Sequence, residues 1–93
     1  MVELFHSTSE KCSRIVTEGY STSFFSAIGM LHTSLRKPVY NIYGFVRFAD
    51  EIVDSFHDFD KKLLLQQFKV ETYDAIERKI SLNPILNSFQ QTV

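Results

Sequence analysis

The sequence contains few residues that break or crosslink a chain. Its 93 residues include one cysteine, two prolines, three glycines and no tryptophan. The single Cys12 cannot form an internal disulfide, so the sequence favours a reducing, cytoplasmic setting. With so few breakers, long helices are favoured over many short strands.

Long apolar runs and an excess of either charge are also missing. No stretch approaches the roughly 20 apolar residues that span a bilayer, and the first residues, MVELFHSTSEK, do not resemble a secretory signal. The formal net charge is −1, which excludes a general attraction to nucleic acid. Residues 61–79 are amphipathic and leave peripheral membrane contact open, although their mixed charges favour a packed helix.

Aromatic and aliphatic residues, in contrast, are plentiful. Hydrophobic residues make up 44% of the chain, with nine Phe and four Tyr. This is enough to build one small core, so we expect a single domain over residues 1–93. The few helix-breaking residues, Gly and Pro, predict an all-α bundle of about five helices.

Local capping signals predict where the first two helices lie. One of Ser7, Thr8 and Ser9 is expected to cap a first helix, which would end near Gly19. Its predicted apolar side carries Cys12, Ile15 and Val16. A short apolar segment over residues 23–32 follows as the second helix.

A third helix is predicted from about Pro38 to Phe56, with the proline in its first turn. Its apolar residues follow the 3, 4, 7 spacing of a buried helix face. They are Ile42, Phe45, Val46, Ala49, Ile52, Val53 and Phe56.

Two further helices are expected after residue 58. Asp58 or Asp60 can cap the fourth, over residues 60–80, and Asn83 followed by Pro84 opens the fifth. The fifth pattern reaches Val93 without a stop signal. The apolar stripe predicted for the fourth helix comprises Leu65, Phe68, Tyr73, Ile76 and Ile80.

The third helix also carries a polar ridge. Tyr43, Arg47, Asp50 and Asp54 are spaced 4, 3 and 4 residues apart, so they share one face, separate from the apolar one. Ionised carboxylates at i and i+4 repel each other by a few tenths of a kcal/mol. A Mg²⁺ ion, which proteins hold with one or two carboxylates plus water and phosphate oxygens, would remove this repulsion.

A solvated helix surface explains the same spacing without a ligand. Acidic pairs at i and i+4 are common on exposed helices. Arg47 could simply pair with Asp50 or Glu51, and Tyr43 could be half-buried packing with its hydroxyl in water. Spacing alone leaves both interpretations open.

Two stretches resemble the squalene/phytoene synthase family. VYNIYGFVRFADEIVD, residues 39–54, is similar to its first aspartate-rich helix, Y-x-x-x-R-x-x-D-[DE]-x-x-D. Upstream, YSTSFFSAIGML, residues 20–31, is similar to its S-x-[ST]-F segment. The form D-E-I-V-D looks more like phytoene and bacterial dehydrosqualene synthases than eukaryotic squalene synthases. The resemblance covers nearly the whole chain but only the N-terminal part of the family.

The resemblance implies an all-α isoprenoid synthase fold around a deep cavity. Members join two prenyl diphosphates, such as farnesyl or geranylgeranyl diphosphate, head to head in a Mg²⁺-dependent reaction of isoprenoid and carotenoid biosynthesis. It assigns Asp50 and Asp54 to Mg²⁺ and diphosphate, with Arg47 and Tyr43 beside the diphosphate.

The upstream segment would then contribute to substrate binding. The resemblance places Ser21 and Ser23 near diphosphate and Phe24 against a prenyl chain. Tyr20 occupies the same segment but departs from the His of several bacterial members. Helix capping by the serines and core packing by the phenylalanine are the alternatives that require no ligand.

The family uses a second aspartate-rich motif, which the remaining acidic residues do not reproduce. We therefore expect an N-terminal portion of such a synthase that is inactive alone and self-associates through uncovered apolar faces. The alternative is a non-catalytic helical interaction or assembly module on the same scaffold.

Overall fold

The computed structural model describes residues 1–93. In it the chain folds into five α-helices and contains no strand. The all-α prediction is therefore confirmed, as is the number of helices. The helices are α1 Val2–Tyr20, α2 Thr22–Ile28, α3 Thr33–Ser55, α4 Lys61–Arg78 and α5 Pro84–Thr92.

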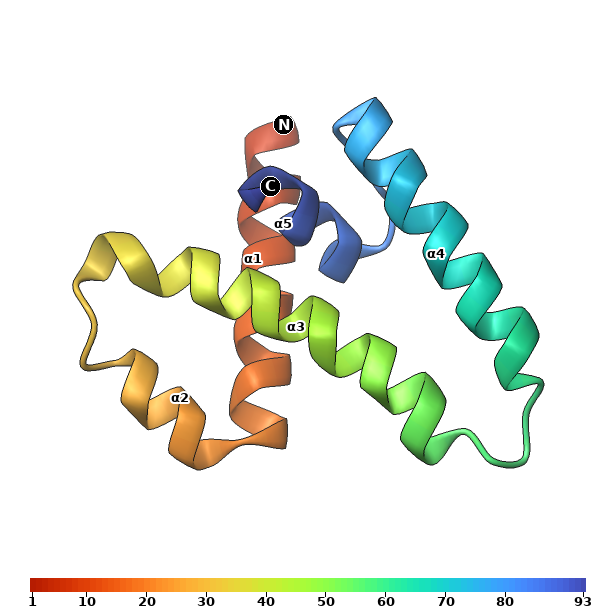
Figure 1. Ribbon diagram of the computed structural model, residues 1–93. Helices are drawn as coiled ribbons and strands as arrows, with labels where there is room; N and C mark the ends of the chain where they lie inside the picture. Colours follow the sequence, from red (N-terminus) through yellow and green to blue (C-terminus); the bar gives the residue numbers. More distant parts are fainter.

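The long helix α3 connects the two sides of the molecule (Figure 1). It crosses α1 near its middle, and α5 packs against both α1 and α3. On one side α2 leads into the start of α3, and on the other α4 follows its end. The principal extents, 39 × 32 × 19 Å, describe a flattened shape in which α2 and α4 are covered on few sides.

Small polar side chains make the contact between α1 and its neighbours. Ser9, Ser13 and Thr17 repeat every fourth residue of α1 and are fully buried. Opposite them on α3 is Gly44, where an added Cβ would lie 3.1 Å from Ser13 Oγ. The Ser13 hydroxyl also shares a hydrogen bond with the Ser88 hydroxyl of α5. Small residues thus allow three helix backbones to approach closely.

The start predicted for the first helix is wrong, whereas its end at Tyr20 lies one residue from the predicted position. The helix begins at Val2, and Gly19 lies inside it. The Ser9 hydroxyl donates to the carbonyl oxygen of Phe5 at 2.9 Å, so this serine bonds back along the helix instead of capping it. The predicted apolar side is also wrong at Ile15, which is exposed, because the buried face is the polar one.

The predicted start of the third helix is wrong as well. Helix α3 begins at Thr33, and Pro38 lies within its second turn. The His32 ring nitrogen Nδ1 accepts the Ser34 N–H at 3.2 Å and caps the helix in place of a Ser, Thr, Asp or Asn. Pro38 removes one intrahelical hydrogen bond, so the helix extends past a residue that normally marks a boundary.

Aromatic rings hold α3, α4 and α5 together. The Phe45 ring stacks on Phe89 with centroids 3.9 Å apart and on Phe68 with centroids 5.4 Å apart. Around them Ile52, Ala75 and Leu86 complete the buried cluster.

The predicted apolar faces are only partly covered. On α3, Ile42, Val46 and Val53 are exposed, and on α4 only Phe68 of the predicted stripe is buried. Helix α4 packs mainly against α3 and α5, so the rest of its surface stays uncovered. The exposed members of the predicted stripe are Leu65, Tyr73 and Ile76 of α4, and Ile80, which lies two residues beyond the end of α4.

The caps predicted for the last two helices are confirmed. Asp60 Oδ1 accepts the Leu63 N–H at 3.0 Å at the start of α4. Asn83 Oδ1 accepts the N–H groups of Ile85 and Leu86 at the start of α5.

Candidate functional site

The acidic part of the polar ridge, Asp50 and Asp54, is called the acidic ridge below. It lies on the second half of α3 and faces solvent. Asp50 and Asp54 are one helical turn apart and both are exposed. Neither carboxylate takes part in an ion pair or a side-chain hydrogen bond within the chain. Both are therefore free to accept an external ligand.

Arg47 pairs with the acidic residue outside the ridge. Its Nη2 donates to Glu51 Oε2 at 3.0 Å, and the two side chains are 23% and 21% exposed. Of the two partners that the spacing allowed, the structure has Glu51 and leaves Asp50 unpaired. The Arg47 Nε is buried and has no hydrogen-bond partner.

Tyr20, at the end of α1, covers the same guanidinium. The Arg47 Cζ lies 4.9 Å from the centroid of the Tyr20 ring, a cation–π contact between residues 27 positions apart. Burial, followed by hydrogen bonding and charge repulsion from Glu51, raises the pKa of the Tyr20 hydroxyl. The protonated phenol, which this shift favours, is the form that can donate to the carboxylate.

Glu51 is the member of this group that the sequence did not single out for the site. Hydrogen bonding from Ser55, Tyr20 and Arg47, in that order, lowers the pKa of its carboxyl against the opposing effect of burial. The sequence does contain a signal for Glu51, since Arg47 and Glu51 stand at the i, i+4 spacing of a helical ion pair.

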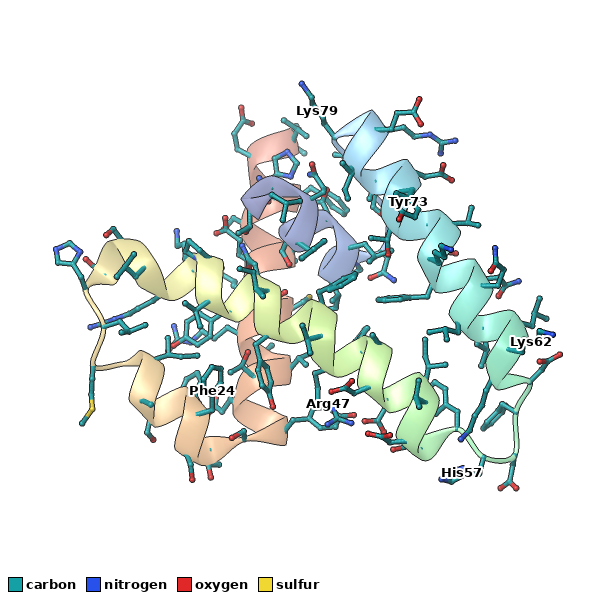
Figure 2. All side chains as sticks on the ribbon, viewed as in Figure 1. Phe24, Arg47, His57, Lys62, Tyr73 and Lys79 are labelled. Atoms are coloured by element: carbon teal, nitrogen blue, oxygen red, sulfur yellow. The ribbon has the colours of Figure 1, made fainter.

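Helix α2 adds an aromatic side chain to the group. The Phe24 ring lies 5.0 Å from the Tyr43 ring, centroid to centroid, at an interplanar angle of 35°. Figure 2 shows Phe24 and Arg47 on the same side of α3, the side along which α2 and the end of α1 lie. Phe24 remains 39% exposed, so its ring is not fully packed into a core.

The two serines of the upstream segment have different roles in the structure. Ser21 is the N-cap of α2, and its Oγ accepts the Phe24 N–H at 3.1 Å. Capping thus explains this serine without a ligand. Ser23 lies exposed in the first turn of α2, and its side chain makes no hydrogen bond within the chain.

The structure therefore brings four predicted residues into two contacts on one side of α3. Tyr20 meets Arg47, and Phe24 meets Tyr43. Both contacts join α3 to earlier segments of the chain. Asp50 and Asp54 continue along the same helix without a partner.

The donor set fits magnesium. Carboxylate oxygens are the protein ligands that Mg²⁺ prefers, and one or two suffice when water and phosphate oxygens complete the coordination. Asp50 and Asp54 could hold the ion in this way. No group of three or more His, Cys, Asp or Glu side chains is placed to bind a metal by itself.

A separate apolar pocket of about 540 Å³ lies between α3 and α4. Phe45 and Ala49 of α3 line it together with Leu65, Phe68 and Tyr73 of α4. None of the predicted site residues lines this pocket, because it belongs to the apolar face of α3.

Comparison with protein families gives a match over most of the chain. The family model described as squalene/phytoene synthase matches residues 17–93. No curated protein and no solved structure matches. No helix is long and apolar enough to cross a membrane. The matched range includes both α2 and the acidic ridge of α3, and the chain belongs to the squalene/phytoene synthase family.

Proposed function

We propose that this chain carries the first diphosphate-Mg²⁺ half-site of a synthase that condenses two prenyl diphosphates head to head. The observation that carries the proposal is the free pair Asp50 and Asp54, exposed on α3 next to a guanidinium. Family membership supports prenyl diphosphates as the substrate class. The form of the acidic motif favours a phytoene or dehydrosqualene type of product.

The two aspartates would bind through their carboxylate oxygens. When bound, Mg²⁺ would neutralise negative charge on a departing diphosphate. Asp50 and Asp54 lose their mutual repulsion in that state, which favours binding at this position over other parts of α3.

Arg47 would support the diphosphate from the preceding turn. The contacts with Tyr20 and Glu51 restrict its side chain before any ligand arrives, which lowers the entropic cost of ordering it. Glu51 accepts from Nη2, and no hydrogen bond within the chain uses Nη1, so the Nη1 N–H groups remain for a phosphate oxygen.

The aromatic pair Phe24 and Tyr43 would lie against the apolar part of the substrate. Their rings are in contact, and Phe24 keeps part of its surface uncovered. Apolar side chains beside a leaving group exclude water from the carbocation that remains. Ser23 and the capping Ser21 flank this pair.

The isolated chain would not complete the reaction. Only one free acidic pair at i, i+4 stands beside an arginine, and it lies on α3. The acidic residues of α4 share their helix with lysines and an arginine. Incubation of the 93-residue chain with farnesyl or geranylgeranyl diphosphate and Mg²⁺ is expected to give no C30 or C40 product. Detection of either product would contradict this part of the proposal.

Calorimetric titration tests the half-site itself. The chain is titrated with a non-hydrolysable prenyl diphosphate analogue in the presence and in the absence of Mg²⁺. We expect heat of binding that depends on Mg²⁺. A chain that serves only as a helical interaction module would show no such metal-dependent heat.

A further inference from the structure

A basic pocket lies between α1 and the first half of α3, away from the acidic ridge. Its volume is about 360 Å³, and four cationic side chains line it. They are Lys11, Arg14, Arg36 and Lys37. Lys37 and Asp50 are 13 residues apart on α3, which corresponds to about 20 Å along a helix axis.

Charge is concentrated at this pocket. Its lining includes four of the ten basic residues of the chain but only one of the eleven acidic residues, Glu10. The lining therefore carries a formal charge of +3, while the rest of the chain carries −4. A concave surface with one sign of charge concentrates the opposite ion.

Both arginines are held in place by contacts within the chain. Arg14 Cζ lies 5.5 Å from the Phe25 ring centroid and 5.9 Å from that of Tyr40. The Arg36 Nε donates to the Leu31 carbonyl oxygen at 3.0 Å, which leaves its two terminal nitrogens available. Pre-ordered guanidinium groups are suited to phosphate, which they bind through paired hydrogen bonds.

Only one of the four cations has an acidic partner. Lys37 Nζ lies 3.5 Å from Glu10 Oε2, whereas Lys11, Arg14 and Arg36 form no ion pair. Ser7, Thr33 and Tyr40, which each carry a hydroxyl group, complete the lining. Most of the positive charge in the pocket is thus not neutralised by the protein.

We propose that this pocket between α1 and α3 binds a phosphate group, with Arg14 and Arg36 as the principal donors. The group could belong to a free phosphate or diphosphate, or to the headgroup of an anionic phospholipid. Leu35 and Leu31, whose carbonyl oxygen accepts from Arg36, are exposed and could contact lipid in the second case. Phosphate binding at this pocket requires neither magnesium nor Asp50 and Asp54.

The first experiment titrates the chain with inorganic diphosphate in EDTA, followed by amide chemical shifts. EDTA removes the metal that the acidic ridge requires. A failure to bind diphosphate in this titration would therefore count against the basic pocket and leave the proposed Mg²⁺ site untouched. We expect shifts at Arg14, Thr33 and Arg36. The double variant R14Q/R36Q should bind at least about tenfold more weakly, because charge-assisted hydrogen bonds to phosphate are lost.

The matched control is K62Q/K69Q, which removes two charges from α4. Both lysines are exposed and form no ion pair, and Figure 2 places Lys62 at the opposite side of the molecule. The control should bind diphosphate almost as well as the wild type. Equal losses in both double variants would mean non-specific attraction and would overturn the proposal.

A gain of binding separates the site from a folding defect. E10Q removes the only carboxylate of the pocket and releases Lys37. It should tighten diphosphate binding by about threefold, because it removes one negative charge that repels the anion from a few ångströms away in water. Unchanged or weaker binding would contradict the proposal.

Vesicle sedimentation identifies the source of the phosphate. Phosphatidylglycerol vesicles that retain the wild type but not R14Q/R36Q, with neutral phosphatidylcholine retaining neither, would assign a lipid headgroup. Binding of diphosphate without vesicle retention would assign a soluble anion. Absence of both interactions would overturn the proposal.

Discussion

Arg47 pairs with Glu51 rather than with Asp50, at an Nη2–Oε2 distance of 3.0 Å. This choice separates the acidic residues of α3 into two kinds. Glu51 neutralises the arginine, whereas Asp50 and Asp54 remain exposed and unpaired. The free carboxylates are the ones that the proposed Mg²⁺ site requires.

The Glu51 pair predicts a dependence of stability on pH. Hydrogen bonding from Ser55 is the largest cause that holds the pKa of Glu51 below its ordinary value of 4.5. A lowered folded-state pKa contributes stability above about pH 4.5, and this contribution is lost as the pH falls through the folded-state value. Thermal unfolding of the wild type should therefore lose more stability below pH 4.5 than unfolding of E51Q. Parallel pH profiles of the two proteins would contradict the pairing.

The Tyr20 ring is expected to stabilise the chain through Arg47. Tyr20→Ala removes the ring and should lower the free energy of unfolding by about 0.5–1 kcal/mol, the size of a cation–π contact at a partly exposed site. Tyr20→Phe keeps the ring and should cost less. Urea denaturation of the three proteins measures both changes, and an equal cost for the two variants would assign the stabilisation to the hydroxyl instead.

The helix crossing at Gly44 should not tolerate a methyl group. A Cβ there would meet Ser13 Oγ at 3.1 Å and Ser13 Cβ at 3.3 Å, and this serine is tied to Ser88. Gly44→Ala is expected to destabilise the chain by about 1–3 kcal/mol, as overpacking does.

Gly19 provides the control for that substitution. It lies within α1, and a Cβ there would meet nothing within 4 Å. Gly19→Ala should therefore stabilise the chain by about 0.5–1 kcal/mol through its helix propensity. Urea denaturation measures both variants, and the account of the crossing would be wrong if both changed stability in the same direction.

Self-association remains a prediction that the exposed apolar residues support. Leu65, Tyr73 and Ile76 of α4 are exposed, as are Val46 and Val53 of α3. We expect the chain to form dimers or larger species at micromolar concentration, since extended apolar patches attract partners. Light scattering after gel filtration measures the mass, and a monodisperse monomer would contradict this expectation.

The sequence predicted the elements better than it predicted their contacts. Capping depends on residues only two or three positions away, so the sequence predicts Asn83 as one cap and Asp58 or Asp60 as the other, and the structure has Asp60. Ser9 was misassigned because its burial against α5 is decided by a segment far along the chain. Pro38 does not mark the start of α3 for a different reason, because the ring of His32, a residue type outside the usual N-caps, caps the helix earlier.

In the candidate site too, the sequence predicts the relationships within one helix and misses the contacts between helices. Helical spacing places Arg47, Asp50 and Asp54 on one ridge, and the structure keeps them on one helix. The contact of Tyr20 with Arg47 joins two helices, so no local pattern could reveal it. The basic pocket likewise combines Arg14 of α1 with Arg36 of α3.

The central claim is that Asp50 and Asp54 form a Mg²⁺-dependent diphosphate site. The most direct measurement compares the wild type, D50N/D54N and the control E71Q/E77Q, each titrated with diphosphate at saturating Mg²⁺ and followed by the amide shifts of residues 47–54. The control removes two exposed carboxylates from α4 and leaves α3 intact. We predict Mg²⁺-dependent shifts in the wild type and the control, and their loss in D50N/D54N. Shifts of equal size in all three proteins, or in none, would contradict the claim.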